Sequence, residues 1–285
     1  MKVAFAGLGV MGFPMAGHLA KAGHEMAVYN RSPEKAARWV EAHGGRAGAT
    51  AAEAAAGAEV FVLCVGNDDD VRQVVGEALP AMALGGVVVD HTTTSAVVAR
   101  EMAALAAKDG RAFVDAPVSG GQAGAENGQL TIMCGAEPDA FAKIEPVIGA
   151  YAKATRLMGG PGSGQLTKMV NQICIAGVVQ GLAEGLHFAK RAGIDPQAVY
   201  EAISKGAAQS WQMDNRWKTM SEGKFDFGFA VDWMRKDLGL VLDEAGRNGA
   251  ALDMTAMVDG FYADVQKLGG RRWDTSSLVA RLEKP

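Results

Sequence analysis

The glycine pattern near the N-terminus constrains the fold of this chain more than any other feature. Gly7, Gly9 and Gly12 form a GxGxxG motif that follows the apolar run Val3–Ala6 and opens a stretch with apolar residues at helical spacing, Met11–Ala22. In a strand–turn–helix unit, the first glycine permits a tight turn, the second lets a pyrophosphate approach the backbone, and the third lets helix and strand pack closely. The helix N-terminus then offers amide groups and a partial positive charge to phosphate. The motif therefore predicts a dinucleotide site, whose turn comprises Gly7, Leu8, Gly9, Val10, Met11 and Gly12.

The first 160 residues alternate short apolar runs with helical stretches. Val60–Val65 and Gly86–Asp90 are continuous apolar runs, which are typical of strands buried on both faces. This alternation predicts an α/β domain of Rossmann type, with a doubly wound parallel sheet and helices on both faces. Further strands are expected at Glu25–Tyr29, Arg111–Asp115 and Leu130–Cys134, and helices at Pro33–Ala42 and Ser95–Ala107.

A dense breaker segment, GGPGSG at residues 159–164, ends this pattern. Beyond it the strand signals disappear, and Gln165–Ala192 predicts one long, mostly apolar helix. We therefore expect an NAD(P)-binding domain over residues 1–160 and an all-α substrate and oligomerisation domain over residues 161–285. Shorter helices are expected at Pro196–Lys205, Ser210–Ser221, Phe229–Asn248 and Thr255–Lys267.

Composition limits the partners and the compartment. The net charge of −4 lacks the basic excess of a nucleic-acid-binding protein, and no uninterrupted apolar run approaches the roughly 18 residues of a membrane span. Cys64, Cys134 and Cys174 are far apart and predict neither a disulfide framework nor a zinc site, so we expect a cytoplasmic protein with buried cysteines. The histidines show no metal-ligand spacing, so no metal is expected, and His91 is a candidate neighbour of the cofactor.

The end of the second predicted strand bears on the choice between NAD and NADP. An NAD site often places Asp or Glu here to bind the ribose 2′-hydroxyl, whereas this chain has Asn30-Arg31-Ser32. Arg31 is suited to a 2′-phosphate and Ser32 to a further hydrogen bond, which favours NADP and leaves NAD possible. The alternative is that Ser32 and Pro33 cap the next helix while Arg31 is a surface charge.

Lys168 is the candidate acid/base group. It lies in an otherwise apolar stretch of the long helix, where a charge is costly unless it is paired or used. Desolvation is expected to lower the pKa of Lys168 toward the range useful for proton transfer. Asn171 at i+3 and Gln172 at i+4 lie on the same helix face. The competing interpretation is a lysine at a helix start whose ammonium reaches solvent.

Four motifs, in order along the chain, resemble those of the β-hydroxyacid dehydrogenase family, which includes 3-hydroxyisobutyrate dehydrogenases, tartronate semialdehyde reductases and succinic/glyoxylic semialdehyde reductases. They are FAGLGVMGFPMAGHLAKAGH at residues 5–24, DAPVSGGQAGAENGQLTIMCG at 115–135, GSGQLTKMVNQ at 162–172 and FAVDWMRKDLGLVLDEA at 229–245. The resemblance implies an NAD(P)-dependent oxidoreductase that interconverts a small β-hydroxy acid and its semialdehyde or keto acid by hydride transfer. Its partner would be a small carboxylate-bearing substrate.

The resemblance also assigns roles to individual residues. Lys168 would be the general acid/base, Asn171 would position the substrate, and Lys236 would lie near both nicotinamide and substrate. The substrate carboxylate would be held by Ser119, Gly120 and Gly121, and the cofactor would be lined by Val65, Gly66 and Thr93. Without the resemblance, the serine and glycines are only a turn, and Lys236 and Asp237 look like a solvated helix face, with an i−4 helix salt bridge from Lys236 to Asp232 as an alternative.

Some residues and functions stay open on the sequence alone. Gln172 stands where some relatives have asparagine, Trp233 stands where a smaller aliphatic residue is frequent, and Trp211 either projects into the substrate cleft or lies in the core. Two alternative functions are a catalytically silent dinucleotide-binding interaction protein and an imine reductase on the same scaffold. The long apolar helices predict a homodimer or homotetramer.

Overall fold

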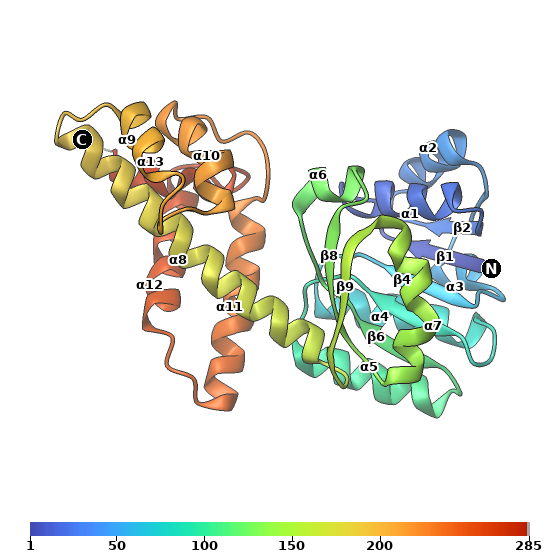
Figure 1. Cartoon of the computed structure of the whole chain (residues 1–285). Helices are drawn as coiled ribbons and strands as arrows, with labels where there is room; N and C mark the ends of the chain where they lie inside the picture. The colour runs from blue at the N-terminus through green and yellow to red at the C-terminus, as the bar shows by residue number, and fades with distance from the viewer. Residues whose placement is uncertain (284–285) are drawn as a thin grey trace. The chain divides into compact units, whose positions relative to one another are not determined.

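The computed structural model of the chain describes residues 1–283. These residues form two compact units, one over Met1–Lys168 and the other from Met169 onward. The first unit is a sheet with helices on both faces, and the second is helical (Figure 1). The predicted α/β class with an all-α C-terminal part is therefore confirmed.

The sheet of the first unit has nine strands in the order β3-β2-β1-β4-β5-β6-β8-β7, with β9 paired to β8. The strands from β1 to β6 pair in parallel, whereas β8 runs antiparallel to β6 and β7. Because β1 lies centrally between β2 and β4, the carboxyl ends of these three strands meet at one edge of the sheet. The strands are β1 Lys2–Ala6, β2 Glu25–Tyr29, β3 Arg46–Ala47, β4 Val60–Leu63, β5 Val87–Asp90, β6 Ala112–Asp115, β7 Val118–Ser119, β8 Leu130–Gly135 and β9 Ala152–Gly159.

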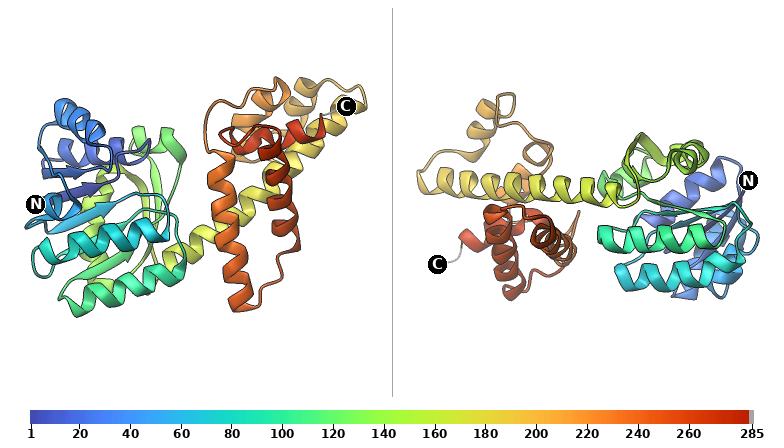
Figure 2. Two further views of the ribbon diagram at one scale, coloured as in Figure 1. Left: turned by 180° about the vertical axis from the view of Figure 1, so that it is seen from behind. Right: turned by 90° about the horizontal axis from the view of Figure 1, so that it is seen from below.

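Each face of this sheet has its own apolar core because alternate strand residues point to opposite faces. Val60 and Val62 belong to one core, and Phe61 and Leu63 belong to the other. The first core is covered by α1 (Gly12–Lys21), α2 (Pro33–His43) and α7 (Pro138–Ile148), and the second by α3 (Ala51–Ala55), α4 (Asp68–Ala78) and α5 (Ala96–Lys108). The view from behind shows α4 and α5 lying across their face of the sheet (Figure 2).

Three strands were not predicted from the sequence. Two of them, β3 and β7, have two residues each. The third, β9, is eight residues long, but its side chains are mostly exposed or half-buried, so it lacks the continuous apolar run of the central strands. The predicted boundary near residue 160 lies at the end of β9.

The second unit contains helices packed around one apolar core. Its core includes Leu186, Trp217, Leu238 and Tyr262, which come from four different helices. The predicted helices are present with ends shifted by a few residues, and α13 was not predicted. The helices are α8 Ser163–Arg191, which begins in the first unit, α9 Pro196–Ile203, α10 Trp211–Ser221, α11 Val231–Asn248, α12 Asp253–Lys267 and α13 Leu278–Leu282.

Helix α8 is long and apolar enough to cross a membrane by length and composition. Only 44% of its most apolar 18-residue window is buried, and the core helix of a soluble protein meets the same criteria. This one helix is weak evidence for a membrane span.

Candidate active site

The glycine-rich turn connects β1 to α1 and has the steric properties that the motif predicts. Gly7 has a φ of +93°, and a Cβ atom there would lie 2.1 Å from the carbonyl oxygen of Cys64. A Cβ atom on Gly12 would lie 1.8 Å from the carbonyl oxygen of Gly7. At Gly9, by contrast, an added Cβ would meet nothing within 4 Å. The turn thus leaves open space at its middle glycine, in front of a helix N-terminus, which fits a pyrophosphate.

Asn30 holds this turn from the neighbouring strand. The backbone N–H of Leu8 donates to Oδ1 of Asn30 at 2.8 Å, and Nδ2 of Asn30 donates to the carbonyl of Ser32 at 3.1 Å. The N–H of Gly7 also donates to the carbonyl of Tyr29. In this conformation Asn30 and the Leu8 amide support the shape of the turn, and their hydrogen bonds are directed within the protein.

Arg31 and Ser32 follow Asn30 at the end of β2. The Arg31 side chain is 85% exposed, and its Nη1 lies 3.4 Å from Oδ1 of Asp70 in α4. Ser32 occupies the residue before α2, with Pro33 in the first turn, but its side chain makes no capping hydrogen bond. The position of Ser32 matches the predicted helix start, while its hydroxyl is not used for the cap.

Val65, Gly66 and Thr93 follow β4 and β5 and are all half-buried. The N–H of Val65 donates to Oγ1 of Thr92 at 3.0 Å, which joins the two strand ends. A Cβ atom on Gly66 would lie 2.5 Å from Oδ2 of Asp70, so this carboxylate lies directly over the backbone of Gly66.

Lys168 lies in the second turn of α8 and is 8% exposed. Its Nζ donates to the carbonyl of Val118 at 2.9 Å. Val118 is followed by Ser119, Gly120 and Gly121, so the lysine is held beside the segment predicted to bind a carboxylate. The two glycines have φ values of +133° and +62°, a region that disfavours other residues, and they lead into α6 (Gly121–Glu126).

The start of α8 is held by a buried carboxylate that sequence reasoning missed. Asp115, at the end of β6, accepts the N–H of Gly162 at 2.7 Å and the N–H of Gln165 at 2.9 Å. It therefore satisfies amide groups that a helix N-terminus leaves without intrahelical partners. Burial raises the pKa of Asp115 to about 6, against the opposite effect of these amide hydrogen bonds. The signal in the sequence was an acidic residue that ends an apolar strand.

Gln165 is a second support that the sequence did not reveal. It is fully buried; its Oε1 accepts the N–H of Thr94 at 3.0 Å, and its Nε2 donates to the carbonyl of Thr92 at 2.8 Å. The side chain thus binds the backbone on both sides of Thr93. Together Asp115 and Gln165 fix α8 one turn before Lys168.

His91 is structural in this arrangement. Its Nδ1 lies 2.6 Å from the carbonyl of Ala116, and its Nε2 lies 2.7 Å from the hydroxyl of Tyr151. Since a carbonyl only accepts, we assign Nδ1 as the donor and Nε2 as the acceptor from Tyr151. Burial lowers the pKa of His91 to about 4, so the ring is neutral near pH 7. Both ring nitrogens of His91 are thus used by protein groups, and its place beside the cofactor stays a prediction.

In the second unit, Asn171 and Gln172 belong to a chain of polar side chains. Nδ2 of Asn171 donates to Oε1 of Gln172 at 2.8 Å, and Nε2 of Gln172 donates to Oδ2 of Asp237 at 2.7 Å. Lys236 continues this chain, since its Nζ lies 3.3 Å from Oδ1 of Asp237. The alternative salt bridge from Lys236 to Asp232 is wrong.

Asp232 is instead used by other groups. It pairs with Arg271 and accepts a hydrogen bond from Gln266. Its spacing of four residues from Lys236 predicted a salt bridge between the two side chains. Asp232 instead contacts Arg271 and Gln266, which are more distant in the sequence.

Several side chains lie elsewhere than expected. Trp211 is 59% exposed and stacks on Arg216, so of its two alternatives the position in the core is wrong. Of the cysteines, Cys134 is buried as predicted and Cys64 is half-buried, whereas Cys174 is exposed, so the prediction of a buried cysteine is wrong there. Among residues 1–283 no group of three or more metal-ligating side chains occurs.

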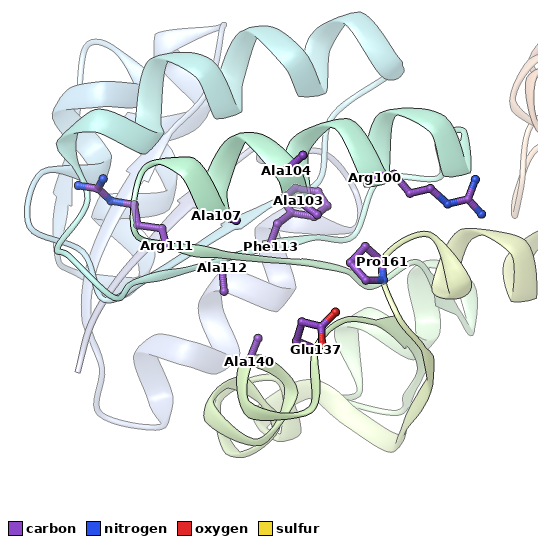
Figure 3. A pocket seen from close by; sticks show the side chains of 10 residues that line it. All are labelled: Arg100, Ala103, Ala104, Ala107, Arg111, Ala112, Phe113, Glu137, Ala140 and Pro161. Carbon is purple, nitrogen blue, oxygen red and sulfur yellow. The ribbon is translucent and has the colours of Figure 1, made fainter.

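A separate groove of about 440 Å³ lies between α5 and α7 (Figure 3). Its middle is lined by alanines, and the heads of Arg100 and Arg111 point away from it in Figure 3. The Arg111 head bonds to the carbonyls of Asp109 and Met82. None of the predicted site residues lines this groove.

Comparison with known proteins agrees with this geometry. Residues 2–160 match the family described as the NAD binding domain of 6-phosphogluconate dehydrogenase. Residues 162–282 match the family described as NAD-binding of NADP-dependent 3-hydroxyisobutyrate dehydrogenase. The chain belongs to the β-hydroxyacid dehydrogenase family. Members of this family are NAD(P)-dependent oxidoreductases that act on hydroxy acids.

Individual members of the β-hydroxyacid dehydrogenase family resemble the chain over nearly all of its length. An uncharacterized oxidoreductase of Shewanella frigidimarina is 64% identical over 99% of this chain and 98% of its own. The 2-hydroxy-3-oxopropionate reductase of Escherichia coli is 34% identical over 99% and 97%. The structure of Mycobacterium tuberculosis 3-hydroxyisobutyrate dehydrogenase with L-serine superposes with a TM-score of 0.91 at 30% identity, covering 99% of both chains.

Proposed function

We propose that this member of the family interconverts a small β-hydroxy acid and its semialdehyde or keto acid, with Lys168 as the general acid/base. The observation that carries the proposal is the hydrogen bond from Nζ of Lys168 to the carbonyl of Val118, directly before Ser119. It holds a buried amine at the residue directly before a serine and two glycines, whose hydroxyl and amide groups are suited to bind a carboxylate.

The chain's own residues account for the proton in this reaction. The nicotinamide, when bound, supplies or accepts the hydride. In oxidation, neutral Lys168 takes the proton of the substrate hydroxyl; in reduction, the charged amine returns a proton to the developing alkoxide. The bond to Val118 uses one N–H in either state, so it orients the amine without preventing the transfer. Asn171 and Lys236 are proposed, from the family pattern, as substrate-positioning groups.

The test of the acid/base assignment is Lys168→Ala. We expect a loss of turnover of about 10²- to 10⁴-fold, with unchanged binding of the reduced cofactor measured by fluorescence. Lys153→Ala, at an exposed lysine of β9, is the matched control and should keep the wild-type rate. Turnover of Lys168→Ala within about threefold of wild type would exclude this role, since general acid/base catalysis contributes far more.

A substrate panel separates the proposed reaction from its alternatives. Small hydroxy acids and semialdehydes are assayed by absorbance of the reduced nicotinamide, beside ketone and amine mixtures. Tight cofactor binding without any turnover would favour the silent binding protein, and turnover only with ketone and amine would favour imine reduction.

We propose NADP as the preferred dinucleotide, with NAD also used. The support is the absence of an acid at the end of β2 and the exposed guanidinium of Arg31 at that place. The measurement is kcat/KM of the wild-type protein for each dinucleotide at one ionic strength. A clear preference for NAD would contradict the proposal.

A further inference from the structure

The end of β2 lacks the carboxylate that many NAD sites carry, but a carboxylate reaches the same edge of the sheet from another element. Asp70 lies in the first turn of α4, the helix that follows β4. Its Oδ1 lies 3.4 Å from Nη1 of Arg31, and its Oδ2 lies against the backbone of Gly66. Arg31 follows β2 and Gly66 follows β4, and these two strands flank β1. Asp70 therefore lies near the chain segments on both sides of the glycine-rich turn.

Asp70 differs from its neighbours in the same turn of α4. Its side chain is 23% exposed, whereas that of Asp69 is 93% exposed and pairs with Arg72. Asp68 accepts hydrogen bonds from the backbone and the hydroxyl of Ser95. Of these three carboxylates, Asp70 is the one that contacts Arg31 and Gly66, at the edge of the sheet where the adenosine half of a dinucleotide is expected.

The backbone around Asp70 does not depend on its charge. The N–H of Asp70 donates to Oδ1 of Asn67 at 2.9 Å, which is the cap of α4. An amide in place of the carboxylate would keep this cap and nearly the same volume. The charge of Asp70 can therefore be removed without removing the support of the helix.

We propose that Asp70 is a specificity-determining residue that moderates the preference for NADP over NAD. With NAD, its carboxylate accepts a hydrogen bond from an adenosine ribose hydroxyl, the role usually given to an acid at the end of β2. With NADP, it repels the 2′-phosphate and competes for Arg31, which must leave the ion pair to bind the phosphate. The inference rests on the proposed use of a dinucleotide at this edge.

The experiment measures binding of two nucleotides that lack nicotinamide and cannot turn over. Dissociation constants for 2′,5′-ADP and 5′-AMP are determined by calorimetry with the whole wild-type chain and with Asp70→Asn. We expect Asp70→Asn to bind 2′,5′-ADP about tenfold more tightly and 5′-AMP about threefold more weakly, because removal of a nearby charge relieves repulsion and weakens a charge-assisted hydrogen bond. The gain for 2′,5′-ADP should shrink as salt is raised.

Asp69→Asn is the matched control, since it removes the same charge from the same helix turn on a side chain that faces solvent. It should change the ratio of the two dissociation constants by less than about twofold, as expected for screened exposed charges. In Arg31→Gln, the gain from Asp70→Asn should also become smaller, because the two residues form one coupled pair.

An unchanged ratio in Asp70→Asn, or an equal change in Asp69→Asn, would overturn the role of Asp70 while leaving the proposed reaction intact. Failure of the wild-type chain to bind either nucleotide would instead overturn the cofactor assignment, and this inference with it. Circular dichroism of each variant checks that the fold is retained, and Arg31→Gln tests the same pair if Asp70→Asn does not fold.

Discussion

The glycine-rich turn after β1 and the start of α8 are built in opposite ways. The turn is shaped by the absence of side chains: Cβ atoms at Gly7 or Gly12 would overlap backbone atoms, and Gly9 faces open space. The start of α8 is shaped by buried polar side chains, Asp115 and Gln165, which bind amide and carbonyl groups of other segments. A site made of backbone groups is therefore limited by steric overlap, whereas a site made of buried polar side chains is limited by whether each donor and acceptor has a partner.

The largest expected effect is at the turn. Gly12→Ala would place a Cβ atom 1.8 Å from the carbonyl of Gly7, and it should lower the free energy of unfolding by more than about 3 kcal/mol in urea. Gly9→Ala is the contrasting variant: its apo stability should change by less than about 1 kcal/mol, because the methyl group meets open space. It should instead weaken cofactor binding. Equal losses of stability in both variants would contradict the view that a side chain overlaps the backbone at Gly12 but not at Gly9.

The second effect is a pH dependence at the His91 support. The pKa of His91 is about 4 in the folded protein and 6.5 when unperturbed, so the unfolded chain binds more protons between these values and stability falls as pH falls. The loss from this group is about 3 kcal/mol between pH 7 and pH 4. The cost of His91→Gln in urea unfolding should therefore be about 3 kcal/mol smaller at pH 4 than at pH 7.

The comparison with His91→Gln is needed because Asp115 acts in the opposite direction. Its pKa is raised from 3.8 to about 6, so the folded state binds more protons in that range and gains stability as pH falls. Asp115 is present in both proteins, and its contribution cancels in their difference. A cost of His91→Gln that does not depend on pH would show that the ring does not titrate as described.

The smallest of these effects is at Gln165. Gln165→Met keeps the side-chain length but leaves the buried N–H of Thr94 and carbonyl of Thr92 without this partner, which should cost about 2 kcal/mol. We also expect kcat to fall more than KM changes, because α8 carries Lys168. Gln180→Met is the control in the same helix, since the side-chain amide of Gln180 donates to Glu184 within α8; this variant should cost less than about 0.5 kcal/mol. Similar losses of stability in the two variants would show that the hydrogen bonds of Gln165 to Thr92 and Thr94 contribute nothing specific.

Much of the fold could be predicted because its signals are local. The apolar runs of β1, β4 and β5 and the helical spacing of α1 and α8 are contained within each segment. The strand β9 was missed because its exposed residues carry no apolar periodicity, and its place beside β8 depends on the rest of the sheet.

The candidate site was predictable to a smaller extent. Lys168 could be selected because burying a charge in an apolar helix costs free energy unless the charge is paired or used in catalysis. The sequence could not assign roles to Asp115, Gln165 and Asp70. Each role depends on a hydrogen-bond or ion-pair partner that lies far away in the sequence. The exposure of Trp211 could not be predicted either, because its stacking on Arg216 cannot be recognised from the helical spacing of apolar residues.

The sequence by itself determined the parallel α/β architecture, the helical second part and the glycine-rich turn, because periodicity and the steric demand for glycine act between near neighbours in the chain. Only the tertiary structure decided how Lys168, Arg31 and His91 are held. Their supports join residues far apart in sequence: 39 positions separate Arg31 from Asp70, and 60 separate His91 from Tyr151. Which buried donor meets which acceptor depends on which strand ends are neighbours in the folded sheet, and no local pattern encodes that order.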